Sequence, residues 1–311
     1  MVNDNQPNIN VYIMTHGPIC EIIPDYCSPL EIGCSVRNEF HYPLRDNADD
    51  DNISDKDSLY CELTGLYYIW KSDRHSITGL AHYRRLFTID SNQIQYLIWK
   101  YDVIIPDYVY CKKSIRESYE KSHVQDDWNI MMDVLQSMYP DYYPDAVKIF
   151  EKSRFIPYNM FISKREILES YCEWLFPLLF SIEPKINLRN RSRYQGRAIG
   201  FLAERLFILW VFHNNLKVKN ISVLTLPPSL DDELGRKIFN VRYAIASPSS
   251  SLRYKEWKAD LKSKGIFIIN NAGANSKKET LAVYLYNYSK LLFYYAIKCY
   301  NYYNNHIRCL E

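Results

Sequence analysis

Glycine is scarce in this chain: only 9 of its 311 residues are glycine, and no low-complexity tract interrupts the sequence. This composition argues against a repetitive or fibrous protein. Hydrophobic residues make up 47% of the chain and charged residues 24%, as in ordinary globular proteins. The length is sufficient to bury a sizeable core. We therefore expect one large α/β domain, alone or with an appendage.

Closely spaced cysteines and long apolar runs are also missing. The 8 cysteines are scattered without a C-x-x-C pair, so we expect reduced thiols in a cytosolic protein and no zinc finger. No apolar run approaches the roughly 20 residues of a membrane-spanning helix, and the first residues do not resemble a signal peptide. Nucleic-acid recognition motifs and the ligand spacing of metal-dependent hydrolases are absent, so no nucleic-acid partner is expected.

Basic residues are concentrated near the end of the chain, and tyrosine is unusually frequent. The formal charge is +2, but from Leu252 to the end ten Lys or Arg residues stand against four acidic ones. A basic end on a mildly acidic body favours contact with an anionic surface such as a membrane. The 28 tyrosines are typical of sugar-binding or interface-forming surfaces, although an AT-rich genome would produce the same excess.

One stretch organises the chain: the apolar run 77–81 ends abruptly in His82, Tyr83, Arg84 and Arg85. The run fits a buried strand of a parallel sheet, and ligands lie beyond the carboxyl ends of such strands. Guanidinium groups match phosphate oxygens bidentately, so two successive arginines indicate an anionic ligand such as a diphosphate. The alternative is an arginine pair held in surface ion pairs.

The residues before this stretch supply further candidates. Residues 9–14 predict a first strand ending at Thr15 and His16, where a nucleotide base often lies, although His16 is equally open to a structural role. Residues 20–57 predict a long polar connection. Its acidic cluster, Asp46 with Asp49, Asp50 and Asp51, is either a divalent-cation site or, as we favour, a solvated loop.

A helix is predicted at 58–71, with Ser54 or Asp57 as its N-cap. Its apolar positions follow three-and-four steps and should pack on the sheet, with Glu62 and Thr64 on other faces. A helix N-terminus in the segment 52–57 would offer backbone N–H groups to a phosphate.

The rest of the chain continues an α/β pattern. We expect a helix at 94–101, a strand at 102–106, polar helices within 110–152, a β-like run at 154–163 and a helix at 165–180. A basic loop (residues 187–197) leads into an apolar helix reaching His213. Glu204, at the start of that helix, is favoured by the helix dipole, or is a terminal charge without a chemical role.

A linker is expected at 247–251, and one long amphipathic helix at 279–308. This helix could lie on a membrane surface, pack on the body of the protein or pair with a partner. We therefore divide the chain into a domain of residues 1–246 and a basic, tyrosine-rich helical region of residues 247–311.

Four of these segments, in this order, resemble the domain of bacterial capsular-polysaccharide, exopolysaccharide and O-antigen glycosyltransferases: Asn52–Ser54 with Tyr60–Lys71, Gly79–Arg85, Tyr158–Ile162 and Glu204–Leu206. The resemblance covers roughly residues 9 to 225. It implies a GT-A-like fold with a single Rossmann-type nucleotide-binding sheet flanked by helices. It also implies transfer of a hexose from a UDP-sugar donor to a lipid-linked glycan acceptor. Some relatives are associated with galactofuranose transfer.

The resemblance and the residues together suggest roles for the site. Many GT-A enzymes neutralise the diphosphate with a metal held by Asp-x-Asp at a strand end, where this chain has His82–Arg85. We expect Arg84 and Arg85 to replace that metal, so that no cofactor is required, with Mn²⁺ or Mg²⁺ at Asp49–Asp51 as the alternative. The basic loop would act as a lid.

Glu204 is the expected catalytic base, with Asp127 in reserve and His123 near it, and a single base favours inversion. The expected donor-binding residues are Thr15, His16, Asn52, Ser54, Glu62, Thr64, His82, Tyr83, Arg84, Arg85, Asn159, Arg197 and Arg205.

These expectations place the protein in the cytoplasm, peripheral on the inner face of the bacterial inner membrane, which it contacts through its C-terminal region. A homodimer contact is the other role open to that region. The competing hypothesis is a non-catalytic polysaccharide-binding or membrane-docked scaffold protein that uses its tyrosine-rich surface.

Overall fold

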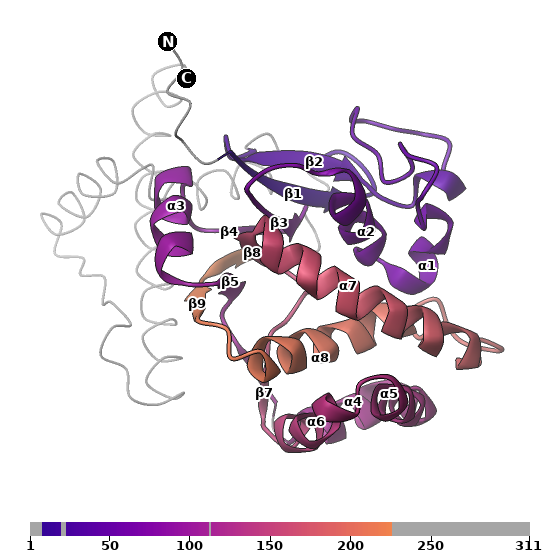
Figure 1. Ribbon diagram of the computed structural model, residues 1–311. Helices are drawn as coiled ribbons and strands as arrows, with labels where there is room; N and C mark the ends of the chain where they lie inside the picture. Colours follow the sequence, from indigo (N-terminus) through magenta and orange to yellow (C-terminus); the bar gives the residue numbers. More distant parts are fainter. Residues whose placement is uncertain (1–7, 20–22, 112, 226–311) are drawn as a thin grey trace, which may run out of the picture. The chain divides into compact units, whose positions relative to one another are not determined.

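The computed structural model describes residues 8–19, 23–111 and 113–225 (Figure 1). The expected linker and the expected amphipathic helix at 279–308 lie outside the described residues, so the division of the chain at 246/247 stays a prediction. Among the helices within these ranges, none combines the length and the apolar character needed to cross a bilayer.

A mixed sheet of 8 strands lies at the centre of the described residues. Its main order is β2-β1-β3-β8-β5-β9, and the short strands β4 and β10 extend from the end of β3. The strands are β1 (Ile9–Thr15), β2 (Cys27–Glu31), β3 (Ile77–His82), β4 (Arg85–Phe87), β5 (Val103–Pro106), β8 (Phe161–Lys164), β9 (Val218–Ile221) and β10 (Val223–Thr225). A separate ribbon pairs β6 (Val109–Tyr110) with β7 (Arg154–Phe155).

The α/β class predicted from the sequence is confirmed, but the sheet is not wholly parallel. Strands β1, β2 and β3 are mutually parallel, as are β5 and β9. Strand β8 runs antiparallel to both of its neighbours, β3 and β5. The carboxyl ends of β1 and β3 therefore meet at one edge, where Met14 lies in register with His82.

Helices cover both faces of the sheet. Helix α3 lies on one face, and α2, α7 and α8 lie on the other (Figure 1). The helices are α1 (Asp57–Tyr60), α2 (Leu63–Ser72), α3 (Ser91–Lys100), α4 (Ile115–Ser122), α5 (Gln125–Met138), α6 (Tyr143–Phe150), α7 (Arg165–Ile182) and α8 (Ala198–His213). Alternate residues of each strand face opposite sides, so Tyr12 and Met14 join the core beneath α2 while Val11 and Ile13 join the core beneath α3.

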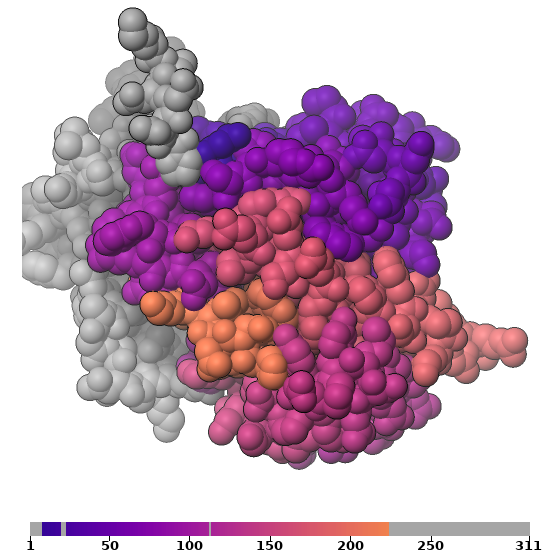
Figure 2. All heavy atoms as spheres, in the orientation of Figure 1, coloured from indigo at the N-terminus to yellow at the C-terminus, as the bar shows by residue number. Residues whose placement is uncertain are grey.

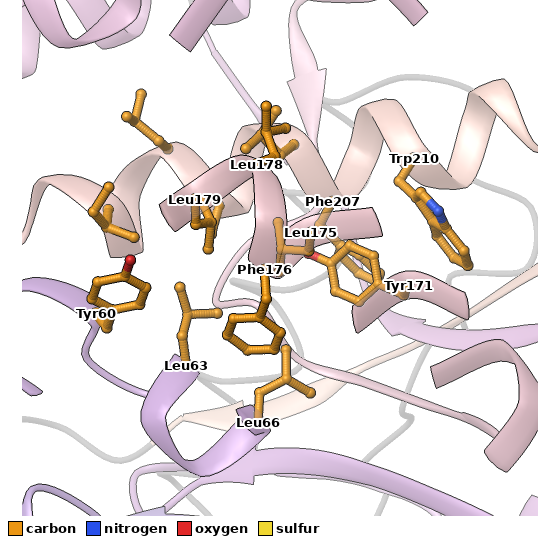
Figure 3. Packing of buried hydrophobic residues seen from close by; sticks show 14 of the residues in the cluster. Tyr60, Leu63, Leu66, Tyr171, Leu175, Phe176, Leu178, Leu179, Phe207 and Trp210 are labelled. Carbon is orange, nitrogen blue, oxygen red and sulfur yellow. The ribbon is translucent and has the colours of Figure 1, made fainter. Parts of the chain in front are cut away.

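Helix α7 is at the centre of the larger core. Its residues Tyr171, Leu175 and Phe176 lie between side chains of α2 and α8, as Figure 3 shows. The ring of Phe176 meets that of Tyr67 edge-on at 4.9 Å between centroids, a favourable geometry for aromatic pairs. In the space-filling view, α7 and α8 separate the N-terminal strands from the α4–α6 segment (Figure 2). The polar helices expected at 110–152 are thus attached to the sheet through α7 and α8.

Three local features differ from the sequence predictions. The connection 20–57 contains the strand β2 at the edge of the sheet. The sequence pattern did not predict this strand because it contains Pro29, and proline is tolerated in strands mainly at sheet edges. The expected helix 58–71 is divided into α1 and α2 at Cys61, which has φ of 54°. Finally, Tyr83 and Arg84 form a tight turn between β3 and β4, in which His82 pairs with Arg85.

Strand β3 approaches β8 so closely that only glycine fits at position 79. A Cβ atom there would lie 2.1 Å from the carbonyl oxygen of Phe161. We expect Gly79→Ala to lower the free energy of unfolding by about 1–3 kcal/mol, the usual cost of overpacking a core, as measured by chemical denaturation. Gly17→Ala is the matched control, since a Cβ atom added at Gly17 would meet no atom within 4 Å. Equal stability of the two variants would contradict this packing.

Candidate functional site

The site is built on the edge of the sheet where β1 and β3 end. The amide of Tyr83 donates to the carbonyl of Met14 at 3.1 Å, so the turn after β3 lies directly beside the end of β1. Beyond β1, Thr15 accepts a hydrogen bond from the amide of Gly17, and His16 bonds to the Asp57 carboxylate at 3.0 Å. Thr15, His16 and the segment His82–Arg85 are therefore brought to one edge, as the strand predictions require.

His82, Glu62 and Asn159 form a buried polar cluster at this edge. The His82 Nε2 atom lies 2.8 Å from the carbonyl oxygen of Tyr158 and 4.0 Å from Oε1 of Glu62. The Asn159 amide donates to the same Glu62 oxygen at 2.9 Å. Burial lowers the pKa of His82 although Glu62 opposes this effect. We infer a neutral imidazole that donates from Nε2 to the Tyr158 carbonyl.

Tyr158 connects this cluster to helix α8. Tyr158 and Asn159 both have left-handed backbone conformations, with φ of 73° and 51°. Such residues are uncommon, and they cluster where a structure holds functional groups in place. Tyr158 receives the His82 hydrogen bond on its carbonyl, and its amide donates to Oε1 of Glu204 at 2.8 Å. One residue thus links the end of β3 to a carboxylate on α8.

Glu204 is the seventh residue of α8, in its second turn, so the prediction that it opens the helix is wrong. The helix begins earlier, at Ala198. The second carboxylate oxygen of Glu204 accepts from Nη1 of Arg205 at 2.6 Å. Its side chain remains 18% exposed. Burial raises the pKa of Glu204, and the nearby Glu62 raises it further against the opposing effect of Arg205. A partly exposed carboxyl group with a raised pKa is suited to general base catalysis.

The side chains of Arg84 and Arg85, which are adjacent in the sequence after β3, contact different aromatic rings. The Arg85 guanidinium lies 4.0 Å from the centroid of the Tyr158 ring, and its buried Nε has no hydrogen-bond partner in the described part of the chain. The Arg84 guanidinium lies 5.0 Å from the Tyr83 ring. Within residues 8–19, 23–111 and 113–225, neither arginine forms an ion pair with a carboxylate. Both guanidinium groups therefore keep donors for an anion.

Arg197 and Cys61 lie close to Glu62. The exposed Arg197, at the N-terminus of α8, donates from Nε to Sγ of Cys61 at 3.0 Å. Burial, together with the charge of Glu62, raises the pKa of the Cys61 thiol to about 12, so this group is protonated near neutral pH. Cys61 was not among the residues predicted from the sequence, because its place depends on the break between α1 and α2.

Three of the predicted donor-binding side chains take part in bonds that organise the local backbone. Buried Ser54 donates to Asp46 at 2.5 Å and accepts from the amide of Ser35 at 3.0 Å. Asn52 accepts from the amide of Ser54, and Thr64 donates to the carbonyl of Cys61. Their expected contact with the donor stays a prediction, and these bonds show a structural role for each.

Asp127 is fully engaged in a buried ion pair. Its two carboxylate oxygens accept from Arg191 at 2.5 and 2.7 Å, and the side chains are only 2% and 8% exposed, respectively. Gln195 also donates to the carbonyl of Ser122 at 2.9 Å. The basic loop expected to act as a lid is therefore fastened at two points to the region where α4 ends and α5 begins. This pairing makes Asp127 an anchor for the loop rather than a free carboxylate.

The acidic cluster of residues 46–51 is dispersed. Asp46 accepts from the amides of Gly33 and Cys34, and Asp51 accepts from Tyr67 and pairs with Lys71 at 3.0 Å. Among the described residues, no three His, Cys, Asp or Glu side chains converge as metal ligands would. This set does not fit a resident Mn²⁺ or Mg²⁺ ion, and the dependence of the protein on metal stays a prediction.

Comparison with solved structures gives a similar fold. The chain is similar to the apo structure of the bifunctional glycosyltransferase WbbM, with a TM-score of 0.66 and 24% sequence identity over 72% of this chain. The match covers 48% of the WbbM chain, so this chain spans about half of that protein. At this identity the similarity concerns the fold, and it confirms the GT-A-like α/β architecture predicted from the sequence.

A search of curated proteins found no match. The family model described as domain of unknown function DUF4422 matches residues 10–215, which contain every element of the site from β1 to α8. The chain therefore belongs to the DUF4422 family.

Proposed function

We propose that this protein is a glycosyltransferase that moves a hexose from a UDP-sugar to a lipid-linked glycan acceptor in capsule or O-antigen synthesis. The observation that carries this proposal is a pair of arginines directly after β3 that form no ion pair among the described residues, one of which, Arg85, interacts electrostatically with the Glu204 carboxylate, whose pKa is raised. The fold shared with the glycosyltransferase WbbM supports a transferase of this class. Galactofuranose is one candidate for the transferred sugar.

The proposed reaction divides the site into two functions. Arg84 and Arg85 bind the diphosphate and stabilise the negative charge that develops as it leaves. Glu204 removes the proton from the acceptor hydroxyl while that oxygen forms a bond to the anomeric carbon. The bond between the anomeric carbon and the diphosphate breaks, and UDP departs with the electron pair. Attack assisted by one base gives inversion at the anomeric centre.

His82, Glu62 and Asn159 act as positioning residues in this scheme. Neutral His82 fixes the carbonyl of Tyr158, whose amide in turn holds one oxygen of Glu204. Asn159 is held between Glu62 and the carbonyl of Gly200 on α8. The carboxylate is thus oriented before substrate binds, which lowers the cost of arranging it during reaction.

Metal independence is part of the proposal: Arg84 and Arg85 take the charge-neutralising role that a metal ion has in many GT-A enzymes. Activity should survive EDTA and show no requirement for Mn²⁺ or Mg²⁺.

We further propose that the reaction takes place at the inner face of the inner membrane, with the basic C-terminal region in contact with the lipid surface. Contact between two copies of the chain is the other role considered for that region.

A panel of UDP-, GDP- and CMP-sugars tests the proposed donor. A ligand that binds the native state raises the midpoint of thermal unfolding. We expect stabilisation by UDP and UDP-sugars in the presence of EDTA, and none by the other two groups. If polysaccharide raises the midpoint of thermal unfolding and no nucleotide does, the result would instead support the competing hypothesis of a non-catalytic polysaccharide-binding protein.

Removing either arginine of the turn should weaken nucleotide binding. Loss of a charge-assisted hydrogen bond costs about 1.5–3 kcal/mol, so we expect Arg84→Ala and Arg85→Ala each to raise the Kd for UDP by at least about tenfold. Isothermal titration calorimetry measures the change. Arg116→Ala is the control, because Arg116 pairs with Glu120 on the surface of α4. Unchanged UDP affinity in both turn variants would refute the assigned diphosphate site.

A further inference from the structure

A cluster of three aromatic rings lies next to the proposed base and has no role in the reaction described above. It consists of Tyr194 from the basic loop, His123 at the end of α4 and Phe201 on α8 and is called the ring cluster below. The centroids of Tyr194 and His123 lie 5.8 Å apart with the rings inclined by 23°. Phe201 lies 4.0 Å from His123 and 5.0 Å from Tyr194.

The ring cluster is open to solvent on one side. Tyr194 is 54% exposed, and His123 and Phe201 are only partly buried. Burial and the positive charge of Arg205 lower the pKa of His123 to about 4. Its imidazole is therefore neutral at physiological pH and presents an aromatic face rather than a charge. Such a face is available to pack against the apolar side of a ligand.

The ring cluster is continuous with the proposed catalytic group. Phe201 precedes Glu204 and Arg205 by three and four residues on α8, so the three side chains lie on one face of the helix. The carbonyl of Phe201 accepts from the same Arg205 Nη1 that holds Glu204. The Arg197 guanidinium lies over the Phe201 ring, 5.5 Å from its centroid, so polar donors adjoin the ring cluster.

From this placement we infer that the ring cluster is the acceptor subsite, where a sugar ring of the acceptor glycan stacks its C–H face on Tyr194. The inference rests on the proposed function. A base that activates the acceptor hydroxyl must lie between the two substrates. The diphosphate is assigned to the arginines after β3, of which Arg85 interacts electrostatically with Glu204, and the ring cluster adjoins Glu204 along α8 through Phe201.

The chemistry of the ring cluster fits a carbohydrate. Sugar rings offer an apolar C–H face bordered by hydroxyl groups, and tyrosine combines an apolar ring with a polar hydroxyl. Arg197 supplies donors for hydroxyl groups at the edge of the stacked ring. The Asp127–Arg191 pair and the Gln195–Ser122 bond fix the basic loop, so Tyr194 is held in position before the acceptor arrives.

Saturation-transfer NMR with octyl glycosides of galactose, glucose and N-acetylglucosamine tests the inference. We expect ring protons of at least one glycoside to receive saturation from the wild-type protein, and Tyr194→Ala to weaken its binding about three- to tenfold. Tyr194→Phe should restore binding because it keeps the stacking face. Leu188→Ala, an exposed apolar position in the same basic loop, should bind as the wild type does.

The outcomes separate this inference from the proposed function. Binding of none of the three glycosides, or equal binding by wild type and Tyr194→Ala, would overturn the acceptor subsite even if UDP binds normally. Loss of glycoside binding in Tyr194→Ala with UDP affinity unchanged would support it. If the protein binds a glycoside at Tyr194 but does not bind UDP, the result would support sugar stacking on Tyr194 and contradict the proposed glycosyltransferase function. Circular dichroism of each variant verifies that the fold is retained.

Discussion

Replacing Glu204 by glutamine should lower the rate of sugar transfer by about 10²–10⁴-fold, the usual contribution of a general base. Glutamine keeps the size of the side chain and can accept the Tyr158 amide, but it cannot take the proton of the acceptor hydroxyl. UDP binding should be retained, because the diphosphate is assigned to Arg84 and Arg85. Steady-state kinetics with parallel calorimetric titration of UDP measures both effects.

The dependence of kcat/KM on pH gives a second test of Glu204 as the catalytic base. Because the pKa of Glu204 is raised above the ordinary 4.5, the active carboxylate is lost as the pH falls through this higher value. The acidic limb of kcat/KM for the wild type should therefore lie above pH 4.5, and the limb should be absent from any residual activity of Glu204→Gln.

Two further variants serve as controls for this prediction. Glu166→Gln changes an exposed glutamate on α7 and should leave the rate unchanged. Glu62→Gln removes the neighbouring carboxylate and should lower the pKa of Glu204, which would move the acidic limb to lower pH. Near-normal turnover by Glu204→Gln would exclude this residue as the base.

The Asp127→Ala variant should lose about 3–5 kcal/mol in the free energy of unfolding, because it leaves the buried Arg191 guanidinium without its partner. Only 8% of the Arg191 side chain is exposed, so water cannot replace both carboxylate oxygens. Urea denaturation measures the loss. The basic loop should also be cleaved more rapidly by trypsin, since this ion pair is one of the interactions that attach it to the body.

A surface ion pair provides the comparison. The Arg116 and Glu120 side chains pair at 2.8 Å on α4, and Arg116 is 50% exposed. Glu120→Ala should cost roughly 0.3–0.5 kcal/mol, as is usual for exposed pairs four residues apart. An equally small effect of Asp127→Ala would show that the buried pair does not anchor the loop. The double variant with Arg191→Ala should be less destabilised than the sum of the single variants, because no unpaired charge remains.

The regular elements were the part of the fold that local sequence patterns predict. Strand β3 was recognisable from its short apolar run, and α7 from apolar residues at helical spacing. Strand β2 was missed because Pro29 masks it, and the division at Cys61 was missed because the apolar spacing continues across it. The turn at Tyr83 and Arg84 contains no glycine, asparagine or aspartate that would mark a hairpin.

The site was predicted only where strand ends bring residues together. Parallel pairing of β1 and β3 makes the proximity of Thr15 and His82 a consequence of topology. The Asp127–Arg191 pair joins residues 64 positions apart, and nothing in either segment specifies the other. The left-handed conformation at Tyr158 likewise accompanies bonds with residues distant in sequence, since its carbonyl contacts His82 and its amide donates to Glu204; only the neighbouring Asn159 is a residue type known to tolerate this conformation.

Release of UDP from UDP-hexoses by the purified chain of residues 1–311 tests the central claim most directly. Glycosyltransferases that lack an acceptor transfer the sugar slowly to water, so UDP should accumulate in the presence of EDTA. The account predicts release by the wild type and a large loss of it in Glu204→Gln, with UDP-galactofuranose included among the donors. Absence of UDP release from every donor, together with absence of UDP binding, would contradict the assignment of this chain as a nucleotide-sugar-dependent glycosyltransferase.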